Sequence, residues 1–243
     1  MSDADVPPDR AADRRRRSAA ADSADSVPFG RGISLFDAVY GFAMTLLIAN
    51  VDPPPAEAWT SMAALVASGA ATQLLGFALS FVVIAVIWRS NVGLMRRLSG
   101  MDGVVTALNL LAAALVILIA FTTQGISDPA TADLPLPTAF YALNIAAVSL
   151  TQTVMYQTAR ARGLERLLRP RSLNRREVLA ALVTPVVFLA SIPTSLLVDA
   201  TAAKLTWLSL VVLNPAAGVL LVRATRGPRP TAEPITPGAV PPR

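Results

Sequence analysis

The ionisable side chain with the most unusual position is Asp37. It lies about one helical turn inside an apolar segment that begins near residue 33. A carboxylate inside a membrane helix costs a few kcal/mol and is usually paired or functional. Arg31 precedes it by six residues, roughly 600° of helix rotation, so the two side chains do not share a face. We therefore expect the partners of Asp37 on other helices, where the polar groups at a similar depth are Trp88, Asn91 and Asn109.

An alternative interpretation places Asp37 in the headgroup zone, as a favourable charge at the positive N-terminal end of its helix. Much other chemistry is excluded by composition. The chain has no cysteine and no histidine, which excludes disulfides, zinc sites with Cys or His ligands, cysteine nucleophiles and Ser-His-Asp relays. No pair of carboxylates lies at the middle of an apolar segment either, so we expect neither an enzyme nor a cofactor.

The elements that must position these residues are membrane helices. Hydrophobic residues make up 53% of the chain and charged residues only 15%, whereas about a quarter of the residues in soluble domains are charged. The apolar residues come in blocks of about 20, the length that crosses a hydrocarbon core of ~30 Å. The predicted fold class is an all-α integral membrane protein with six transmembrane helices, at 33–51, 70–89, 103–124, 137–159, 178–198 and 202–222.

The predicted organisation is one transmembrane domain between two polar tails. The first tail mixes acidic and basic residues and the second is rich in proline, so neither has the composition of a packed core. The first apolar segment starts too late for a signal peptide and is expected to remain as a helix. The predicted divisions are a disordered cytoplasmic tail at 1–30, the six-helix domain at 31–223 and a disordered Pro-rich cytoplasmic tail at 224–243, with a short interfacial helix within 56–68.

The basic residues indicate the orientation. Of the 21 lysine and arginine residues, 20 fall in the two tails and in the loops after the second and fourth spans. The other side carries Lys204 together with Asp52, Glu57, Asp128, Asp133 and Asp199. The positive-inside rule then places both termini in the cytoplasm, and the excess of arginine over lysine favours the cell membrane of a GC-rich bacterium. We expect the basic patches to contact anionic lipid headgroups, not nucleic acid.

Two sides of the first helix follow from the helical rotation of roughly 100° per residue. One side carries the carboxylate and is expected to pack into the helix bundle; its members are Asp37, Gly41, Met44 and Ile48. The other side is mostly apolar and free to face lipid or a symmetry axis; its members are Phe42, Thr45, Leu46 and Ala49. Taken alone, an apolar stripe of this kind indicates helix packing and says nothing about conduction.

The segment from Arg31 to Leu47, RGISLFDAVYGFAMTLL, resembles the first helix of the transmembrane protein 175 family, the endolysosomal potassium channel and its prokaryotic relatives. In that family the helix is marked by Arg, three residues and Phe-Ser-Asp, followed by an apolar run with Thr-Leu-Leu. Further matches follow in order along the chain, at Ser80, Phe81, Trp88, Asp102, Asn109, Leu110, Leu111, Phe121 and Thr122. The resemblance spans about residues 31–124 and continues as matching topology.

The resemblance implies six helices per subunit without a reentrant pore loop, and a homotetramer assembled around the first helix. It implies a potassium-permeable, weakly selective cation channel with K⁺ as the permeant ion and no cofactor. Carried over by position, the pore constriction would consist of Phe42, Thr45, Leu46 and Ala49, and the polar network of Arg31, Asp37, Trp88, Asn91 and Asn109. Apolar rings can gate by dewetting, and the sequence contains no Thr-Val-Gly-Tyr-Gly filter segment.

The chain departs from the family pattern at three places. Leu35 and Phe36 stand where the family has Phe-Ser, Asn91 stands where it has His, and Ala49 is small where a bulky residue is expected. Two other functions therefore stay open, a secondary transporter and a membrane protein that does not conduct. Transporters usually show paired repeats and broken helices, and the prolines in the fifth and sixth spans are the one hint of that kind.

Overall fold

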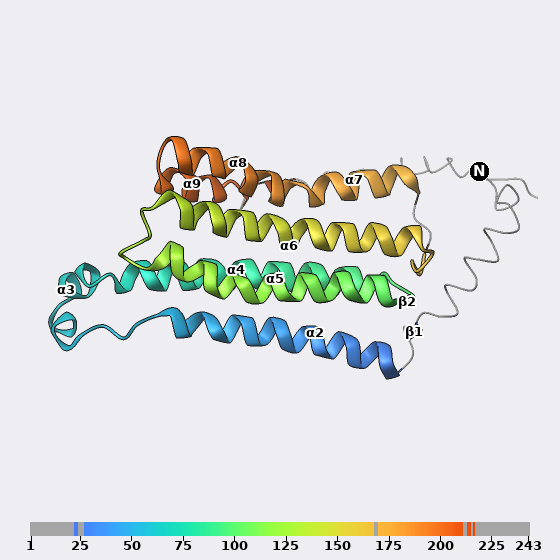
Figure 1. The fold of residues 1–243 in the computed structure, drawn as a ribbon, viewed down its shortest axis with the longest axis horizontal. Coiled ribbons are helices and arrows are strands. Elements are labelled where there is room, and N and C mark those ends of the chain that lie inside the picture. Colours follow the sequence, from blue (N-terminus) through green and yellow to red (C-terminus); the bar gives the residue numbers. More distant parts are fainter. Residues whose placement is uncertain (1–21, 24–26, 168–169, 211–212, 215, 217–243) are drawn as a thin grey trace, which may run out of the picture.

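The protein is described by a computed structural model that places residues 22–23, 27–167, 170–210, 213–214 and 216. Long helices run side by side along one axis (Figure 1). They are α2 (Val27–Leu46), α4 (Ala70–Met95), α5 (Gly103–Ser127), α6 (Pro135–Ala161), α7 (Arg171–Ala181) and α8 (Val183–Leu197), followed by the shorter α9 (Ala200–Trp207). Helices suit such apolar segments because each one satisfies its own backbone N–H and C=O groups without water.

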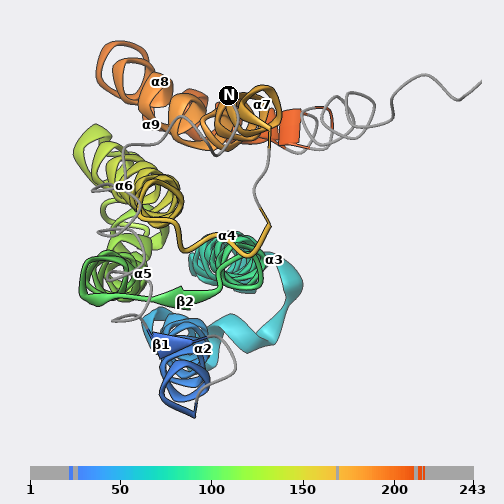
Figure 2. The ribbon, with the colours of Figure 1, turned by 90° about the vertical axis from the view of Figure 1, so that its right-hand side faces the viewer.

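The helices are arranged so that α2 occupies one edge. In end view α2 lies against α4 and α5, α6 lies beyond α5, and α8 and α9 lie on the far side of α6 (Figure 2). Buried side chains between them include Tyr40, Leu47, Ile84 and Tyr141, with Phe36 and Met95 in a second cluster. Because the neighbours of α2 are all on one side, its opposite side is uncovered within a single subunit.

Four helical segments are long and apolar enough to cross a membrane: Phe29–Asn50, Ala70–Met95, Gly103–Ser127 and Arg171–Leu197. The fourth predicted span coincides with α6, a helix of 27 residues that is long enough but more polar. Its polar side chains, such as Asn144 and Gln152, are buried against neighbouring helices. The sixth predicted span begins within α9, and its end, from residue 217 on, lies outside the described residues. An all-helical membrane fold is thus supported, and a count of six spans stays a prediction.

The first helix begins earlier than predicted. α2 starts at Val27, inside the segment expected to be a tail, and Pro28 in its first turn needs no hydrogen-bond acceptor there. Phe29 is buried, which anchors this turn to the bundle. Before it, β1 (Asp22–Ser23) pairs antiparallel with β2 (Gly100–Met101), a short exception to the all-α expectation. Residues 1–21 of the first predicted tail and all of 224–243 lie outside the described residues.

The segment between the fourth and fifth spans also differs from expectation. Its second half is helical, as α7, where we predicted a basic loop. α7 ends at Ala181 and α8 starts at Val183, and the break has a local cause. Pro185 has no N–H to donate to the carbonyl of Ala181, whereas Val186 N does bond to Leu182 O at 3.0 Å.

The end of the bundle away from these basic residues is closed by short helices. η2 (Leu47–Asn50) continues α2 as a tighter 3₁₀ turn, and the predicted short helix within 56–68 is present as two pieces, η3 (Ala56–Thr60) and α3 (Met62–Ala67). Ser61 caps α3 by accepting from Ala64 N at 3.1 Å. Gly69 turns the chain into α4 with a φ of 82°, and a Cβ there would collide with Pro129.

Candidate functional site

The side of α2 that faces the bundle is defined by Phe36, Tyr40, Ala43 and Leu47, all of them buried. Their spacing of three and four residues places them on one stripe of the helix. This corrects our expectation for the packed side, because Asp37, Gly41 and Ile48 are exposed and Met44 is only partly buried. The carboxylate does not mark the inner side of the helix, since it lies at the flank of the packed stripe.

The candidate constriction residues lie largely on the uncovered side of α2. Phe42 is 61% exposed, and Thr45 and Ala49 are also exposed. Leu46 differs, since it is partly buried and packs against the core. The Thr45 hydroxyl donates to the Phe42 carbonyl at 2.8 Å, which leaves its oxygen lone pairs directed to the surroundings. This side therefore presents one aromatic ring, one hydroxyl oxygen and small side chains.

The candidate polar network is divided into separate pairs. Trp88 Nε1 of α4 donates to Asp37 Oδ1 at 2.8 Å, across from one helix to the next. Asn91 Nδ2 donates to Asn109 Oδ1 at 2.8 Å, and this amide pair joining α4 to α5 is buried. No hydrogen bond joins the two pairs to each other. Arg31 is exposed and forms no ion pair with Asp37, in agreement with the rotation between them.

Two further groups of buried polar contacts were not anticipated. Ser80 Oγ lies 3.1 Å from Tyr141 Oη and 2.7 Å from Thr123 Oγ1, so one residue from each of α4, α5 and α6 meets at one point. Gln152 of α6 donates to Tyr40 Oη at 3.0 Å and to the Ile87 carbonyl at 3.2 Å. Hydroxyl and amide groups commonly join helices in this way within a membrane. A glutamine inside an apolar segment was the signal available in the sequence.

At the basic end, Asp102 joins the start of α5 to the end of α6. Its carboxylate accepts from the backbone N–H groups of Val104 and Val105 at 3.1 and 3.0 Å as the N-cap, and it also pairs with the Arg162 guanidinium. Burial alone would raise the pKa of Asp102, but these donors outweigh it and hold the pKa below its usual range. The carboxylate therefore stays ionised as a structural junction.

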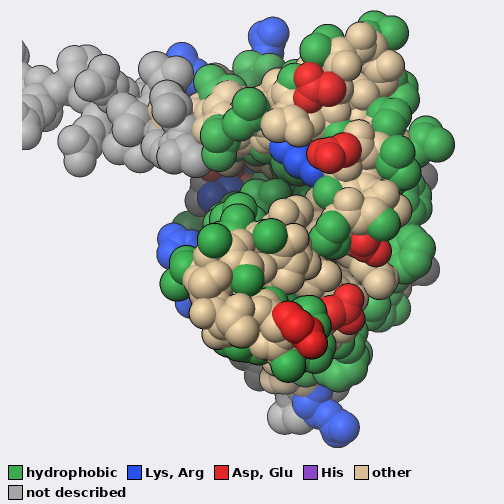
Figure 3. All heavy atoms as spheres, turned by 90° about the vertical axis from the view of Figure 1, so that its left-hand side faces the viewer, with side chains coloured by type: hydrophobic (Ala, Val, Ile, Leu, Met, Phe, Trp, Pro, Cys, Tyr) green, Lys and Arg blue, Asp and Glu red, His purple; other side chains and the backbone are tan. Residues whose placement is uncertain are grey.

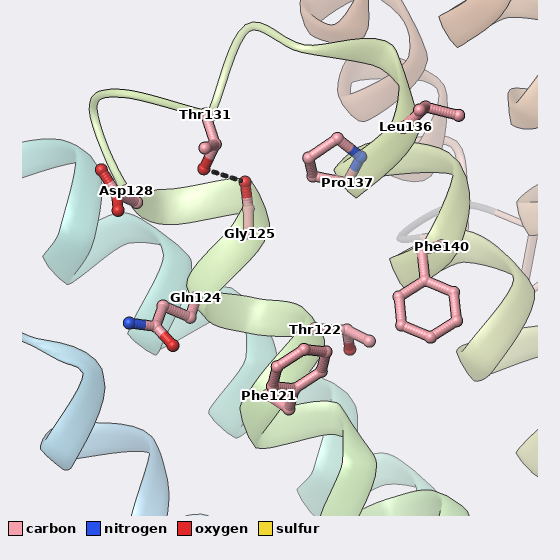
Figure 4. A pocket seen from close by; sticks show the side chains of 9 residues that line it. All are labelled: Phe121, Thr122, Gln124, Gly125, Asp128, Thr131, Leu136, Pro137 and Phe140. Carbon is pink, nitrogen blue, oxygen red and sulfur yellow. Dashed lines mark hydrogen bonds between the residues drawn. The ribbon is translucent and has the colours of Figure 1, made fainter.

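A pocket of about 470 Å³ opens at the opposite end, where α5 turns into α6 (Figure 4). Phe121 and Phe140 face each other across it in an edge-to-face arrangement, with ring centroids 6.4 Å apart. Its one ionisable side chain, Asp128, caps a local turn by accepting from Ala130 N at 2.8 Å. Without an acid–base pair, and with no group of metal-ligating residues anywhere in the described part of the chain, the pocket offers no recognisable catalytic chemistry.

Charge divides the molecule along its long axis. The described arginines of the α4–α5 turn and of the segment from Arg160 to Arg176 lie at one end, with β2 and the start of α2. The end seen in Figure 3 instead shows several acidic patches among apolar and uncharged groups. On that end Lys204 Nζ donates to the carbonyls of Ile126 and Ala132, at 3.2 and 2.7 Å. The described part of the chain thus keeps the separation predicted from the loops.

Comparison with known proteins connects this helix arrangement to a channel family. Residues 31–119, which contain most of α2, all of α4 and most of α5, match the family model for the endosomal/lysosomal potassium channel TMEM175. No curated protein matches the chain. The match falls on the segment that carries both the candidate constriction and the candidate polar pairs, and it confirms the resemblance to the transmembrane protein 175 family.

One solved structure supports the same relation at the level of the fold. It is the crystal structure of a TMEM175 homolog from Chamaesiphon minutus, described as a lysosomal potassium-selective channel. Its chain and this one share 21% sequence identity, with a TM-score of 0.57, and the alignment covers 83% of this chain and all of the other. At this identity the likeness shows a common fold.

Proposed function

We propose, from the match of residues 31–119 to the potassium channel family, that this chain is a subunit of a potassium-permeable, weakly selective cation channel in a bacterial cell membrane. The family match is the observation that carries the proposal. The fold shared with a TMEM175 homolog supports it, and the separation of charge supports an orientation with the arginine-rich end in the cytoplasm.

The pore of this proposed channel is lined by α2 from each of four subunits. A single subunit leaves one side of α2 uncovered, and that side carries Phe42, Thr45 and Ala49. Four Phe42 rings around an axis would form an apolar constriction that closes by dewetting. Four Thr45 hydroxyl oxygens next to it would offer a cation weak, neutral ligands. Leu46 lies partly against the core, so its contribution to the pore is smaller.

In the same proposal α6 and the segment beginning with α9 are the fourth and sixth spans, and both chain termini are cytoplasmic. The buried positions of Asn144 and Gln152 support a membrane location for α6, because polar side chains of a spanning helix face protein and not lipid.

Purified protein in liposomes tests the conduction. An outward gradient of K⁺ is expected to drive K⁺ flux by itself, with a smaller flux of Na⁺ under the same gradient. Flux that strictly requires a counter-ion would indicate a transporter, and the absence of flux would indicate a protein that does not conduct.

A cysteine crosslink tests the axis, because the chain has no cysteine of its own. Ala49→Cys, on the uncovered side of α2, is expected to form disulfide-linked dimers on mild oxidation. Val82→Cys, on the exposed side of α4, is the matched control and is expected to stay monomeric. Equal crosslinking of both variants, or of neither, would contradict the proposal that Ala49 lies near an axis shared by the subunits.

A further inference from the structure

A second cavity lies at the arginine-rich end of the molecule, away from α2. It has a volume of about 490 Å³ and lies between α4, α6 and the α7–α8 segment, three elements that Figure 2 shows in end view. The polar side chains around it include Arg89, Ser90, Arg97, Gln157, Glu177 and Asn214. None of them belongs to the candidate constriction or to the Asp37 and Asn91 pairs.

The side chains that line the cavity change from charged to apolar along the helix axes. Arg97 and Glu177 lie toward the end of the bundle, where α4 ends and α7 runs. Val86 and Ile87 lie two to three turns further in on α4, and Ala181 lies one turn further in on the α7–α8 side. The more deeply placed Gln152 is already bonded to Tyr40 and Ile87. The cavity therefore combines charged groups at its mouth with an apolar wall deeper in the bundle.

The charges at the mouth do not cancel. Arg97 Nη1 forms an ion pair with Glu177 Oε2 at 3.2 Å and lies over the ring of Tyr156, with 5.8 Å to the centroid. Arg89 is exposed and, among the described residues, forms neither a hydrogen bond nor an ion pair. The cavity therefore has two guanidinium groups and one carboxylate, with a positive charge left over at Arg89.

We propose that this cavity binds the phosphate headgroup of an anionic phospholipid from the cytoplasmic leaflet, with Arg89 as its principal contact. The planar guanidinium matches phosphate oxygens in two parallel hydrogen bonds. Arg89 lies about 9 Å inside the end of α4, at 1.5 Å per residue. It is also the last residue of the predicted second span, so we expect its base at the boundary between headgroups and acyl chains. From there the side chain extends toward the headgroup layer while its stem stays in apolar surroundings.

The apolar wall identifies a lipid as the occupant in preference to a free anion. Val86, Val178 and Ala181 give an acyl chain a surface to follow into the bundle. A free phosphate ion would gain the contact with Arg89 but nothing from this wall. Basic side chains near a membrane surface also attract anionic lipid to it.

The experiment compares lipid binding by Arg89→Gln with binding by a matched control, Arg96→Gln. Arg96 is an exposed arginine of the same segment that does not line the cavity. Detergent-purified protein is titrated with phosphatidylglycerol, phosphatidylcholine or inorganic phosphate, and bound ligand is counted by native mass spectrometry. Melting of each variant without added lipid establishes that its fold is intact.

The expected result is one tight phosphatidylglycerol site per subunit that Arg89→Gln weakens on the order of tenfold, the loss typical of one charged hydrogen-bonded contact. Arg96→Gln keeps wild-type affinity, and phosphatidylcholine binds weakly. Equal losses in the two variants would overturn the proposal, because they would show only general attraction to a basic surface. Inorganic phosphate competing as well as the lipid would overturn it in favour of a free anion. Neither readout depends on K⁺ flux, so this site and the proposed channel activity can fail independently.

Discussion

The uncovered side of α2 and the interface between α4, α5 and α6 are built in opposite ways. The side of α2 presents Phe42, Thr45 and Ala49 to the outside of the subunit and makes no hydrogen bond to another helix. The interface buries Ser80, Thr123 and Tyr141 in mutual hydrogen bonds. The helices that form these two regions are apolar segments of similar length. The two regions therefore differ in the contacts that their side chains make and not in overall composition.

This difference indicates that the residues that hold the helices together are separate from the residues proposed to line the pore. Within a membrane, hydrophobic burial drives helices together only weakly, so close packing and buried hydrogen bonds hold them. Those features are concentrated in the interface of α4, α5 and α6. The uncovered side of α2 is free of them, and substitutions there should change permeation without unfolding the subunit.

The largest loss is expected at Gly76 of α4, which has no room for a larger side chain against α5. A Cβ at Gly76 would collide with the side chain of Ser127, so Gly76→Leu is expected to lower the free energy of unfolding by about 3 kcal/mol. Gly41→Leu is the matched control on α2, because nothing lies within 4 Å of a Cβ there. Unfolding by titration with a denaturing detergent measures both. Similar losses of unfolding free energy in the two variants would contradict the proposal that the uncovered side of α2 contributes less to stability than the interface of α4, α5 and α6.

A smaller loss is expected from breaking the buried amide pair. Asn109→Leu leaves the Asn91 amide without its acceptor, at a cost of about 1–3 kcal/mol. Combining it with Asn91→Leu removes both polar groups, so the double variant is expected to recover part of that loss. A double-mutant cycle on the unfolding free energy gives the coupling. Strict additivity would mean that the hydrogen bond contributes nothing.

The Asp102 junction is expected to contribute about 0.5–1 kcal/mol and to depend on pH. The pKa of its carboxyl is lower in the folded protein, so its stabilisation is fully present above the unfolded value near 3.8 and is lost as the pH falls through the folded value. Asp102→Asn keeps a side-chain acceptor for the cap but loses the charge that pairs with Arg162. The melting temperature of this variant should therefore change less than that of wild type below about pH 4. An identical acid dependence would assign the effect to other carboxylates.

The smallest loss of stability is expected for Phe42→Ala, together with the clearest change in flux. Phe42 is 61% exposed, so we expect a change in unfolding free energy of less than about 0.5 kcal/mol. The K⁺ flux out of liposomes under the outward K⁺ gradient is expected to rise severalfold, because a constriction of smaller side chains is easier to wet. Phe81→Ala, an exposed phenylalanine on α4, is the matched control and should leave the flux unchanged. Unchanged flux in both variants would remove Phe42 from the constriction.

The sequence predicted the helices well because apolar runs of membrane length are distinctive, as for α4 and α5. It misjudged the packed side of α2, because Asp37 was assumed to point inward. Trp88 reaches Asp37 at the flank, which lets the carboxylate find a partner without being buried. The spacing of the apolar residues Tyr40, Ala43 and Leu47 indicates the side of α2 that is buried.

Contacts between distant segments were harder to predict. The partner of Asn91 is Asn109, and the partner of Gln152 is Tyr40, which is 112 residues away. Spacing along one helix does not determine which residue of another helix will lie opposite it. α7 was missed for a different reason, since its sequence is charged and lacks a buried residue that would mark it as an element.

α7 has no buried residue, so apolar packing contributes little to its position. Polar contacts join it to its neighbours, through Arg97 with Glu177 at 3.2 Å and through Gln157 with Asn174 at 3.2 and 3.0 Å. A one-residue turn at Leu182 separates α7 from α8. Because an ion pair between partly exposed side chains joins α7 to α4, we expect a rise in ionic strength at the arginine-rich end to weaken this contact.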